Sequence, residues 1–210
     1  MNLIEKYKYY RKIGMKLNHT ILDKCLDRDT LKKSAKLLGI ERKGVLVFDN
    51  EDETSVLMDF AMHDFRFINK TIVERYKEKF GGKNEIEKEI LDAQIASYTS
   101  LFKVTDVPRT EHTLILTDLL NKRENIKLID IAFSSINSIY GILLFTRLVS
   151  FKDFTMTSGV SFPFQPDTEN HLIRQYKMKR EKVKSDNEAV KRFVAFYQLY
   201  RWCGIPVNYV

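Results

Sequence analysis

The chain has 210 residues, of which 44% are hydrophobic and 12% aromatic, and its formal net charge is +7. This composition is too apolar for a disordered chain and is sufficient for a packed core. No apolar run approaches the ~18 residues that span a membrane, and the first residues lack the apolar stretch of a secretory signal. We therefore expect a cytoplasmic protein with one large domain or two small ones.

Charge is unevenly distributed along the chain. Residues 1–48 hold 12 Lys/Arg and 5 Asp/Glu, residues 49–170 hold 14 and 20, and residues 171–210 hold 9 and 3. Two interpretations stay open: the basic ends form a nucleic-acid surface, or they dock on the acidic middle and partly neutralise it. We prefer the second, because charge on a protein surface is more often explained by solubility than by a specific binding partner.

Helical spacing dominates the first hundred residues. Apolar residues at spacings of three and four predict a helix over 2–18, followed by a second over 20–25. A third helix is expected to begin near Asp29 or Thr30 and to end at Gly39, which supplies the stop. The apolar run at 45–48 is β-branched and aromatic, which favours a short strand.

Three further helices have start signals. Four acids among residues 49–53 are typical of a helix N-terminus, where Asp52 or Thr54 can cap, although paired carboxylates can also bind a divalent cation. Thr71 with Glu74 has the spacing of a capping box, and Asn84 followed by Glu87 repeats that signal.

From residue 101 the apolar period changes from helical to strand-like. Five strands are expected, over 101–107, 113–118, 126–132, 142–150 and 155–164. In the stretch EHTLILTDLLNKRENIKLID, residues 111–130, two of them flank a charged turn. Five short strands with tight turns suit a small closed barrel of SH3-like or Sm-like type, which leaves no exposed edge.

The tail from residue 166 returns to helical spacing. The aromatic stripe that includes Val190, Phe193, Val194 and Tyr197 predicts a helix that packs on the core. The predicted class is therefore α+β, with a helical region at 1–98, a barrel at 99–165 and a helical segment at 166–210, packed as one compact unit.

A resemblance covers roughly residues 55–165. The segments MDFAMHDFRFINKTIVERY (58–76), SLFKVTDV (100–107), LILTDLL (114–120) and ILLFTRLVSFKDFTMTSG (142–159) resemble a group of uncharacterised bacterial proteins. Those proteins often carry the zinc-binding tail motif found at the C-terminus of the SecA translocase, whose clustered Cys and His this chain lacks. The resemblance implies a helix-plus-barrel fold and a bacterial or phage origin, and it implies no activity.

No catalytic or cofactor-binding motif is present, so we expect no cofactor and do not favour an enzyme. Cys25 and Cys203 have no zinc-ligand spacing, and the four histidines are scattered, so we expect reduced thiols and no metal site. The remaining enzymatic alternative is a metal-dependent nuclease, because two-metal sites need only carboxylates. Its candidate residues would be Asp118, Glu124 and Asp130.

Two binding functions from different classes remain. The first is an accessory role that depends on a protein partner or on self-association, with no membrane partner. We prefer it because an acidic barrel region would repel a phosphate backbone. The alternative is nucleic-acid binding by the basic ends, where Tyr7, Tyr9 and Tyr10 are interleaved with cations and could stack on bases. The candidate contacts are Lys6, Lys8, Arg11, Lys12, Arg174, Lys177, Lys179, Arg180, Lys182 and Lys184.

Overall fold

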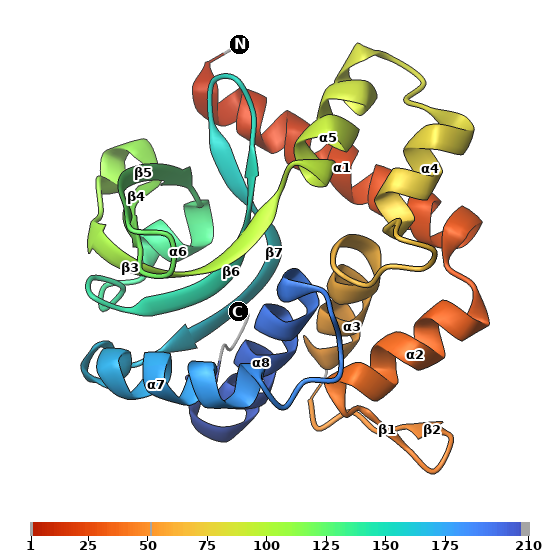
Figure 1. The fold of residues 1–210 in the computed structure, drawn as a ribbon. Coiled ribbons are helices and arrows are strands. Elements are labelled where there is room, and N and C mark those ends of the chain that lie inside the picture. Colours follow the sequence, from red (N-terminus) through yellow and green to blue (C-terminus); the bar gives the residue numbers. More distant parts are fainter. Residues whose placement is uncertain (1, 51, 207–210) are drawn as a thin grey trace. The chain divides into compact units, whose positions relative to one another are not determined.

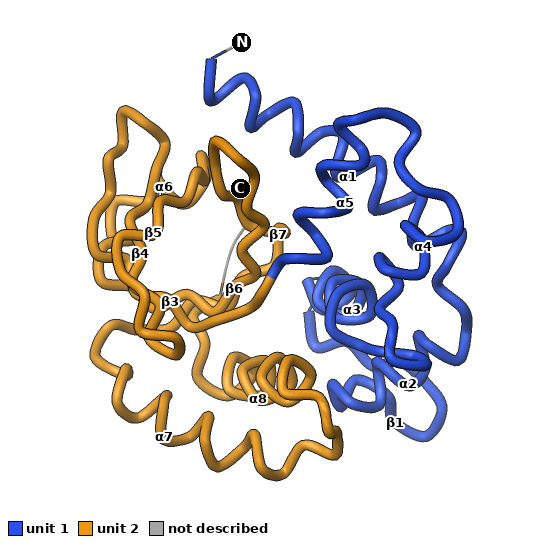
Figure 2. Tube along the Cα trace, turned by 45° about the horizontal axis from the view of Figure 1, so that its top comes forward, with its two compact units in different colours: residues 1–97 blue, residues 98–210 orange. Residues whose placement is uncertain are grey.

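The computed structural model describes residues 2–50 and 52–206. The chain divides into two compact units, residues 1–97 and 98–210, which are coloured separately in Figure 2. The first unit is helical apart from one small hairpin, and the second combines a five-stranded sheet with helices. The class is therefore α+β.

The first unit contains five helices and a two-stranded hairpin among the residues described. The elements are α1 (Leu3–Cys25), α2 (Arg28–Leu38), β1 (Glu41–Arg42), β2 (Val45–Leu46), α3 (Asp52–His63), α4 (Ile72–Phe80) and α5 (Glu85–Ile95). Among the residues described, none of the helices in either unit combines the length and apolarity that a bilayer crossing requires.

The first two predicted helices are one continuous helix, α1. The expected break near residue 20 is absent: the Thr20 hydroxyl donates to the Lys16 carbonyl one turn earlier (3.0 Å), which leaves the helical backbone continuous. The helix begins with a capping box between Asn2 and Glu5. Its buried stripe is the predicted one: Tyr7, Tyr10, Gly14, Leu17 and Ile21 are buried.

The predicted starts and stops of the later helices are confirmed. Thr71 and Glu74 form a complete capping box at α4, and the Asn84 side chain accepts from the Glu87 amide at α5. Gly39 ends α2 in the left-handed conformation, with φ of 77°. These signals are local hydrogen bonds over three residues, so the sequence alone specifies them.

The second unit starts at the first strand of the sheet. Its elements are β3 (Tyr98–Asp106), a 3₁₀ turn (Arg109–Glu111), β4 (Thr113–Asp118), β5 (Arg123–Ile129), α6 (Ile131–Ser135), β6 (Leu143–Ser150), β7 (Thr155–Phe164), a second 3₁₀ turn (Pro166–Thr168), α7 (Glu169–Arg180) and α8 (Glu188–Cys203). All five predicted strands are present; the third one ends at Ile129 because Asp130 caps α6.

The sheet is antiparallel with the order β5-β4-β3-β6-β7 (Figure 1), and it does not close into the predicted barrel. An SH3-like or Sm-like meander would pair the third strand with the fourth, but α6 leads the chain away from β5 and β6 returns beside β3. Among the described residues no backbone ladder joins β5 to β7, and the Thr157 hydroxyl instead donates to the Asp130 carboxylate (3.4 Å).

The two faces of the sheet contact different partners. One face forms an apolar cluster that includes Phe102, Val104, Leu116 and Leu144. The opposite face is covered by α8, whose Phe196 stacks on Phe145 of β6 at 4.3 Å between ring centroids. Both faces are therefore buried over β3 and β6, which explains why every residue from Leu143 to Val149 is buried, Thr146 and Arg147 included.

Candidate functional site

The basic residues at the N-terminus lie on α1, but most of the aromatic residues between them belong to the core. Tyr7 and Tyr10 are buried, and the Tyr10 hydroxyl donates to the Glu89 carboxylate of α5 at 2.6 Å. Lys6 lies over the Tyr10 ring at 5.4 Å and Arg11 over the Tyr7 ring at 5.9 Å. The expectation that these two tyrosines stack on bases is therefore wrong, because their rings already pack inside the first unit.

One side of α1 is exposed and basic. Lys8, Lys12 and Lys16 follow each other at intervals of four residues and are all exposed. Tyr9 is the one member of the predicted tyrosine set that reaches solvent, with 44% of its surface exposed. Within the part of the chain that the structure describes, none of these three lysines forms an ion pair.

The two units differ in how acids are distributed. Residues 49–97 carry 7 Lys/Arg and 12 Asp/Glu, whereas the strand region 98–165 carries 7 and 6. The acid excess of the middle of the chain therefore belongs to α3, α4 and α5 of the first unit. The second unit has 16 Lys/Arg and 11 Asp/Glu, so its net charge is +5. The sheet is nearly neutral, and the argument that it repels a phosphate backbone does not hold.

In the second unit the predicted cations lie on α7 and on the turn that follows it. Arg174, Lys177, Lys182 and Lys184 are exposed, and among the described residues they form no ion pair. Since none of the described acids pairs with them, these four charges are exposed to solvent.

Arg180 is different from its neighbours. It pairs with Glu181 at 3.2 Å and with Glu188 of α8 at 3.4 Å. A hydrogen bond with Tyr176 and the charge of Glu188 raise the pKa of Arg180 further. Lys191 pairs with the same Glu188 at 3.1 Å, so this cluster links α7 to α8. Arg180 is therefore engaged in structure, unlike the exposed cations of α7.

An exposed aromatic pair lies on the same two helices and was not predicted. Trp202, in the last turn of α8, has 63% of its surface exposed, and its ring lies 5.9 Å from that of His171 on α7. Helical periodicity did not distinguish Trp202 from the buried aromatic residues of α8. The only sequence signal was its position in the last turn of the helix.

A second exposed feature lies in the first unit, in the turn between α3 and α4. Phe67 and Lys70 exchange backbone hydrogen bonds of 3.0 and 3.2 Å, which makes a two-residue hairpin turn. Its central residues, Ile68 and Asn69, both have positive φ, 51° and 63°. A β-branched residue is strained in this conformation, yet Ile68 occupies the tip with 81% of its surface exposed.

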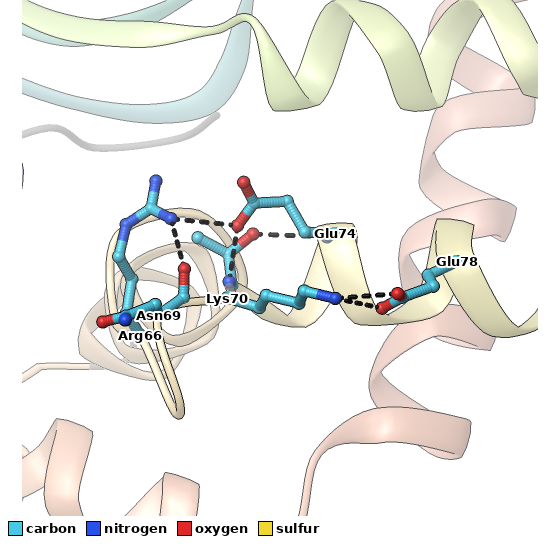
Figure 3. Close-up of polar contacts among 6 residues, drawn as sticks. Arg66, Asn69, Lys70, Glu74 and Glu78 are labelled. Atoms are coloured by element: carbon cyan, nitrogen blue, oxygen red, sulfur yellow. Dashed lines mark hydrogen bonds and ion pairs between the residues drawn. The ribbon is translucent and has the colours of Figure 1, made fainter.

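Polar contacts hold this turn in place (Figure 3). The Arg66 guanidinium donates to the Asn69 carbonyl at 2.9 Å and to the Glu74 carboxylate at 3.1 Å, and Lys70 donates to Glu78 at 2.6 Å. Burial alone would raise the pKa of the Glu74 carboxyl, but hydrogen bonds with Thr71 and the charge of Arg66 outweigh it and lower that pKa below the ordinary value. These contacts thus fix the turn to the first two turns of α4.

The carboxylates proposed for a nuclease have structural roles. Asp118 accepts hydrogen bonds from the Ser100 hydroxyl and from the Leu120 and Asn121 amides, and so fixes the turn after β4. Asp130 accepts from the Phe133 amide at the start of α6. Glu124 is exposed on the edge strand β5. Within the described residues, the structure holds no group of three His, Cys, Asp or Glu that could bind a metal ion.

The two cysteines are free thiols, one in each unit. Burial raises the pKa of both, and it is partly offset by Arg75, Lys79 and Lys24 near Cys25 and by Lys179 near Cys203. A raised pKa leaves less thiolate at neutral pH, so neither group has the character of an activated nucleophile.

The sequence profile of one family, described as a family of unknown function (DUF7986), matches residues 1–210. The chain belongs to this family. No curated protein and no solved structure matches the chain. The DUF7986 match covers both units, including α7 and α8 with their basic surface. The resemblance to proteins with a SecA-type tail stays a prediction.

Proposed function

We propose that this DUF7986 protein binds nucleic acid through the second unit. The supporting observation is the surface of α7 and the following turn, where Arg174, Lys177, Lys182 and Lys184 are exposed with no acidic partner among the described residues. Phosphate contacts by Lys and Arg release condensed counterions, and this term supplies most non-specific affinity. Unpaired cations on a unit of net charge +5 are suited to that role.

The topology of the sheet is consistent with this proposal. Counted in chain order, the five strands of the second unit lie in the order 3-2-1-4-5, with α6 between the third and fourth. This arrangement resembles the OB-fold, a partly open five-stranded barrel that binds oligonucleotides in many proteins. A fold supports several functions, so the proposal rests on the unpaired cations rather than on the strand order.

The test compares two triple variants that remove the same charge. Arg174→Ala/Lys177→Ala/Lys182→Ala removes unpaired cations of the second unit. Lys70→Ala/Lys77→Ala/Lys88→Ala removes lysines of the first unit that pair with Glu78, Asp92 and Glu85. Binding to a labelled oligonucleotide is measured by anisotropy over a range of salt concentrations.

We expect the first variant to weaken binding and to flatten the dependence of log K on log salt by about 2 units, at about 0.7 per phosphate contact for single strands. The second variant should bind as the wild type does. Equal weakening by both variants would mean that net charge alone attracts the oligonucleotide. Absence of binding by the wild-type protein at physiological salt would refute the proposed function.

The second candidate is the accessory role with a protein partner, and the strained turn at Phe67–Lys70 supports it. Backbone strain at a non-glycine residue costs about 1–3 kcal/mol and is retained where the surroundings enforce it, often at functional sites. Here the strain holds an exposed Ile68 at the tip, beside Phe67 with Lys33 above its ring at 5.3 Å. The partner that fits is a protein with an apolar pocket and an acidic rim.

Ile68→Asn tests this candidate, because Asn tolerates positive φ and removes the apolar side chain. We expect the free energy of unfolding to stay equal or to rise, whereas affinity for a purified partner falls. Met15→Ala, which truncates another exposed apolar residue of the same unit, is the control and should leave the affinity unchanged. A partner bound equally well by Ile68→Asn would exclude this turn as the contact.

A further inference from the structure

Trp202 is the only tryptophan of the chain, and it lies at the surface of the second unit. Its ring lies 5.9 Å from the ring of His171, and the two ring planes are inclined at 40°. The pair therefore joins one residue of α7 to one residue of α8. Exposed tryptophan is unusual, since this side chain is highly buried on average. The indole therefore needs an explanation other than packing.

The backbone beneath Trp202 is held rigidly. The ring of Tyr200 stacks on Phe162 of β7 at 4.9 Å, and a Cβ at Gly204 would lie 2.0 Å from that ring, so only glycine fits there. The Gly204 amide donates to the Tyr200 carbonyl at 2.8 Å, and the Ile205 amide donates to the Pro163 carbonyl at 2.9 Å. Trp202 thus projects from a fixed scaffold, which lowers the entropy cost of binding a ligand.

A cation on α7 lies beside this aromatic pair. Arg174 follows His171 by three residues, so the two side chains are neighbours on one face of α7. Lys177 lies on the same helix, and among the described residues neither Arg174 nor Lys177 forms an ion pair. An exposed aromatic pair on a helix that also carries unpaired cations matches a strand whose bases are exposed and whose phosphates lie alongside.

We infer that Trp202 and His171 form a stacking platform for a base of single-stranded nucleic acid, with Arg174 and Lys177 at its phosphates. This inference rests on the proposed nucleic-acid binding. It specifies in addition that the ligand is single-stranded and that Trp202 stacks on a base. Bases in a duplex are stacked on each other and cannot reach an exposed indole, so the platform selects single strands. Recognition of this kind tolerates many sequences, because every base has a π face.

The intrinsic fluorescence of Trp202 can be used to test this contact. Because Trp202 is the sole tryptophan, its fluorescence reports on this position alone. We expect oligothymidylate to quench that fluorescence and a duplex of equal length to leave it unchanged. Titration of Trp202→Phe, which lacks the fluorophore, gives the background, and anisotropy of a labelled strand measures binding in parallel.

Substitutions then separate stacking from charge. Trp202→Ala should weaken binding about 5- to 150-fold, the range for loss of one base–aromatic stack, and Trp202→Phe should retain most of the affinity. Tyr9→Ala is the matched control, since Tyr9 is also an exposed aromatic residue among lysines, but in the first unit. Met178→Ala removes an exposed apolar residue of α7 itself. Neither control should change the affinity.

The outcomes distinguish this inference from the proposed function. If oligothymidylate binds in a salt-dependent way but neither the fluorescence nor the Trp202→Ala affinity changes, the platform is refuted and the basic surface remains. Equal quenching by duplex would also refute it. If no nucleic acid binds, the proposed function itself fails. If Trp202→Ala alters self-association instead of binding, the indole is a contact between copies of the chain.

Discussion

Helices α1 and α8 both carry aromatic residues in a basic stretch of sequence, but the two helices differ in which of these rings are buried. In α1 the rings of Tyr7 and Tyr10 are buried and cations cover them. In α8 a group of buried rings contacts the sheet, and one further aromatic residue, Trp202, is exposed beside His171 of α7, the helix that also carries the exposed Arg174 and Lys177. The alternation of aromatic and basic residues therefore does not identify a nucleic-acid surface, because burial decides which rings a ligand can reach.

Cations also differ in whether they form an ion pair. In the first unit Arg66, Lys70, Lys77 and Lys88 each pair with an acid, and Figure 3 shows two of these pairs beside the turn after α3. The exposed cations of α7 have no such partners among the described residues. Within the part of the chain described, both units therefore hold paired as well as unpaired cations, and in the first unit the unpaired ones include Lys8, Lys12 and Lys16 of α1.

The largest expected effect tests the packed side of α8. Phe196 is fully buried and stacks between Phe145 and Tyr176, at 4.3 and 4.6 Å. Phe196→Ala should lower the free energy of unfolding by about 3–5 kcal/mol, as truncation of a buried aromatic residue does. Trp202→Ala should change it little. Chemical denaturation measures the free energy of unfolding of both variants. A similar decrease for the two would show that Trp202 is packed as Phe196 is.

A smaller effect tests the burial of aromatic residues in α1. Tyr10→Phe removes the hydroxyl that donates to Glu89 at 2.6 Å and keeps the ring. We expect a loss of about 1.5–3 kcal/mol, the range for a hydrogen bond to a charged group. Nucleic-acid affinity should not change. A stable Tyr10→Phe protein with weakened binding would instead place Tyr10 in the interface.

The pH dependence of the first unit should reflect Glu74. Its pKa in the folded protein lies below its ordinary value of 4.5, because the interactions with Thr71 and Arg66 outweigh burial. A lowered pKa contributes stability above pH 4.5 that is lost as the pH falls through the folded pKa. Glu74→Gln keeps the capping geometry but loses the titrating group. Unfolding at pH 7 and pH 3 should therefore differ less in this variant than in the wild type.

The smallest effect tests the paired cations of the first unit. Lys70 and Glu78 are about half exposed and form a bidentate contact at 2.6 and 2.7 Å. Exposed pairs contribute about 0.2–1 kcal/mol, so Lys70→Ala should cost no more than that. The loss should shrink at high salt. A larger, salt-independent loss would show that Lys70 stabilises the strained turn by more than charge.

Several features of this chain follow from its sequence alone. The capping residues Thr71, Asn84 and Gly39 define helix ends because each forms hydrogen bonds with residues only three or four positions away. Strands β4 and β7 have the predicted bounds, since the period of two and the flanking turns are also local. The buried stripes of α1 and α8 were readable for the same reason.

Tertiary structure alone decided the strand order and the candidate site. The sequence predicted five strands but not that α6 separates β5 from β6 and leaves the sheet open. It could not separate Tyr10 from Trp202 either. Tyr10 is buried and meets Glu89, 79 residues away, whereas Trp202 keeps 63% of its surface exposed in the last turn of α8. Local patterns fix which residues share a face, whereas burial depends on the elements that arrive from distant parts of the chain.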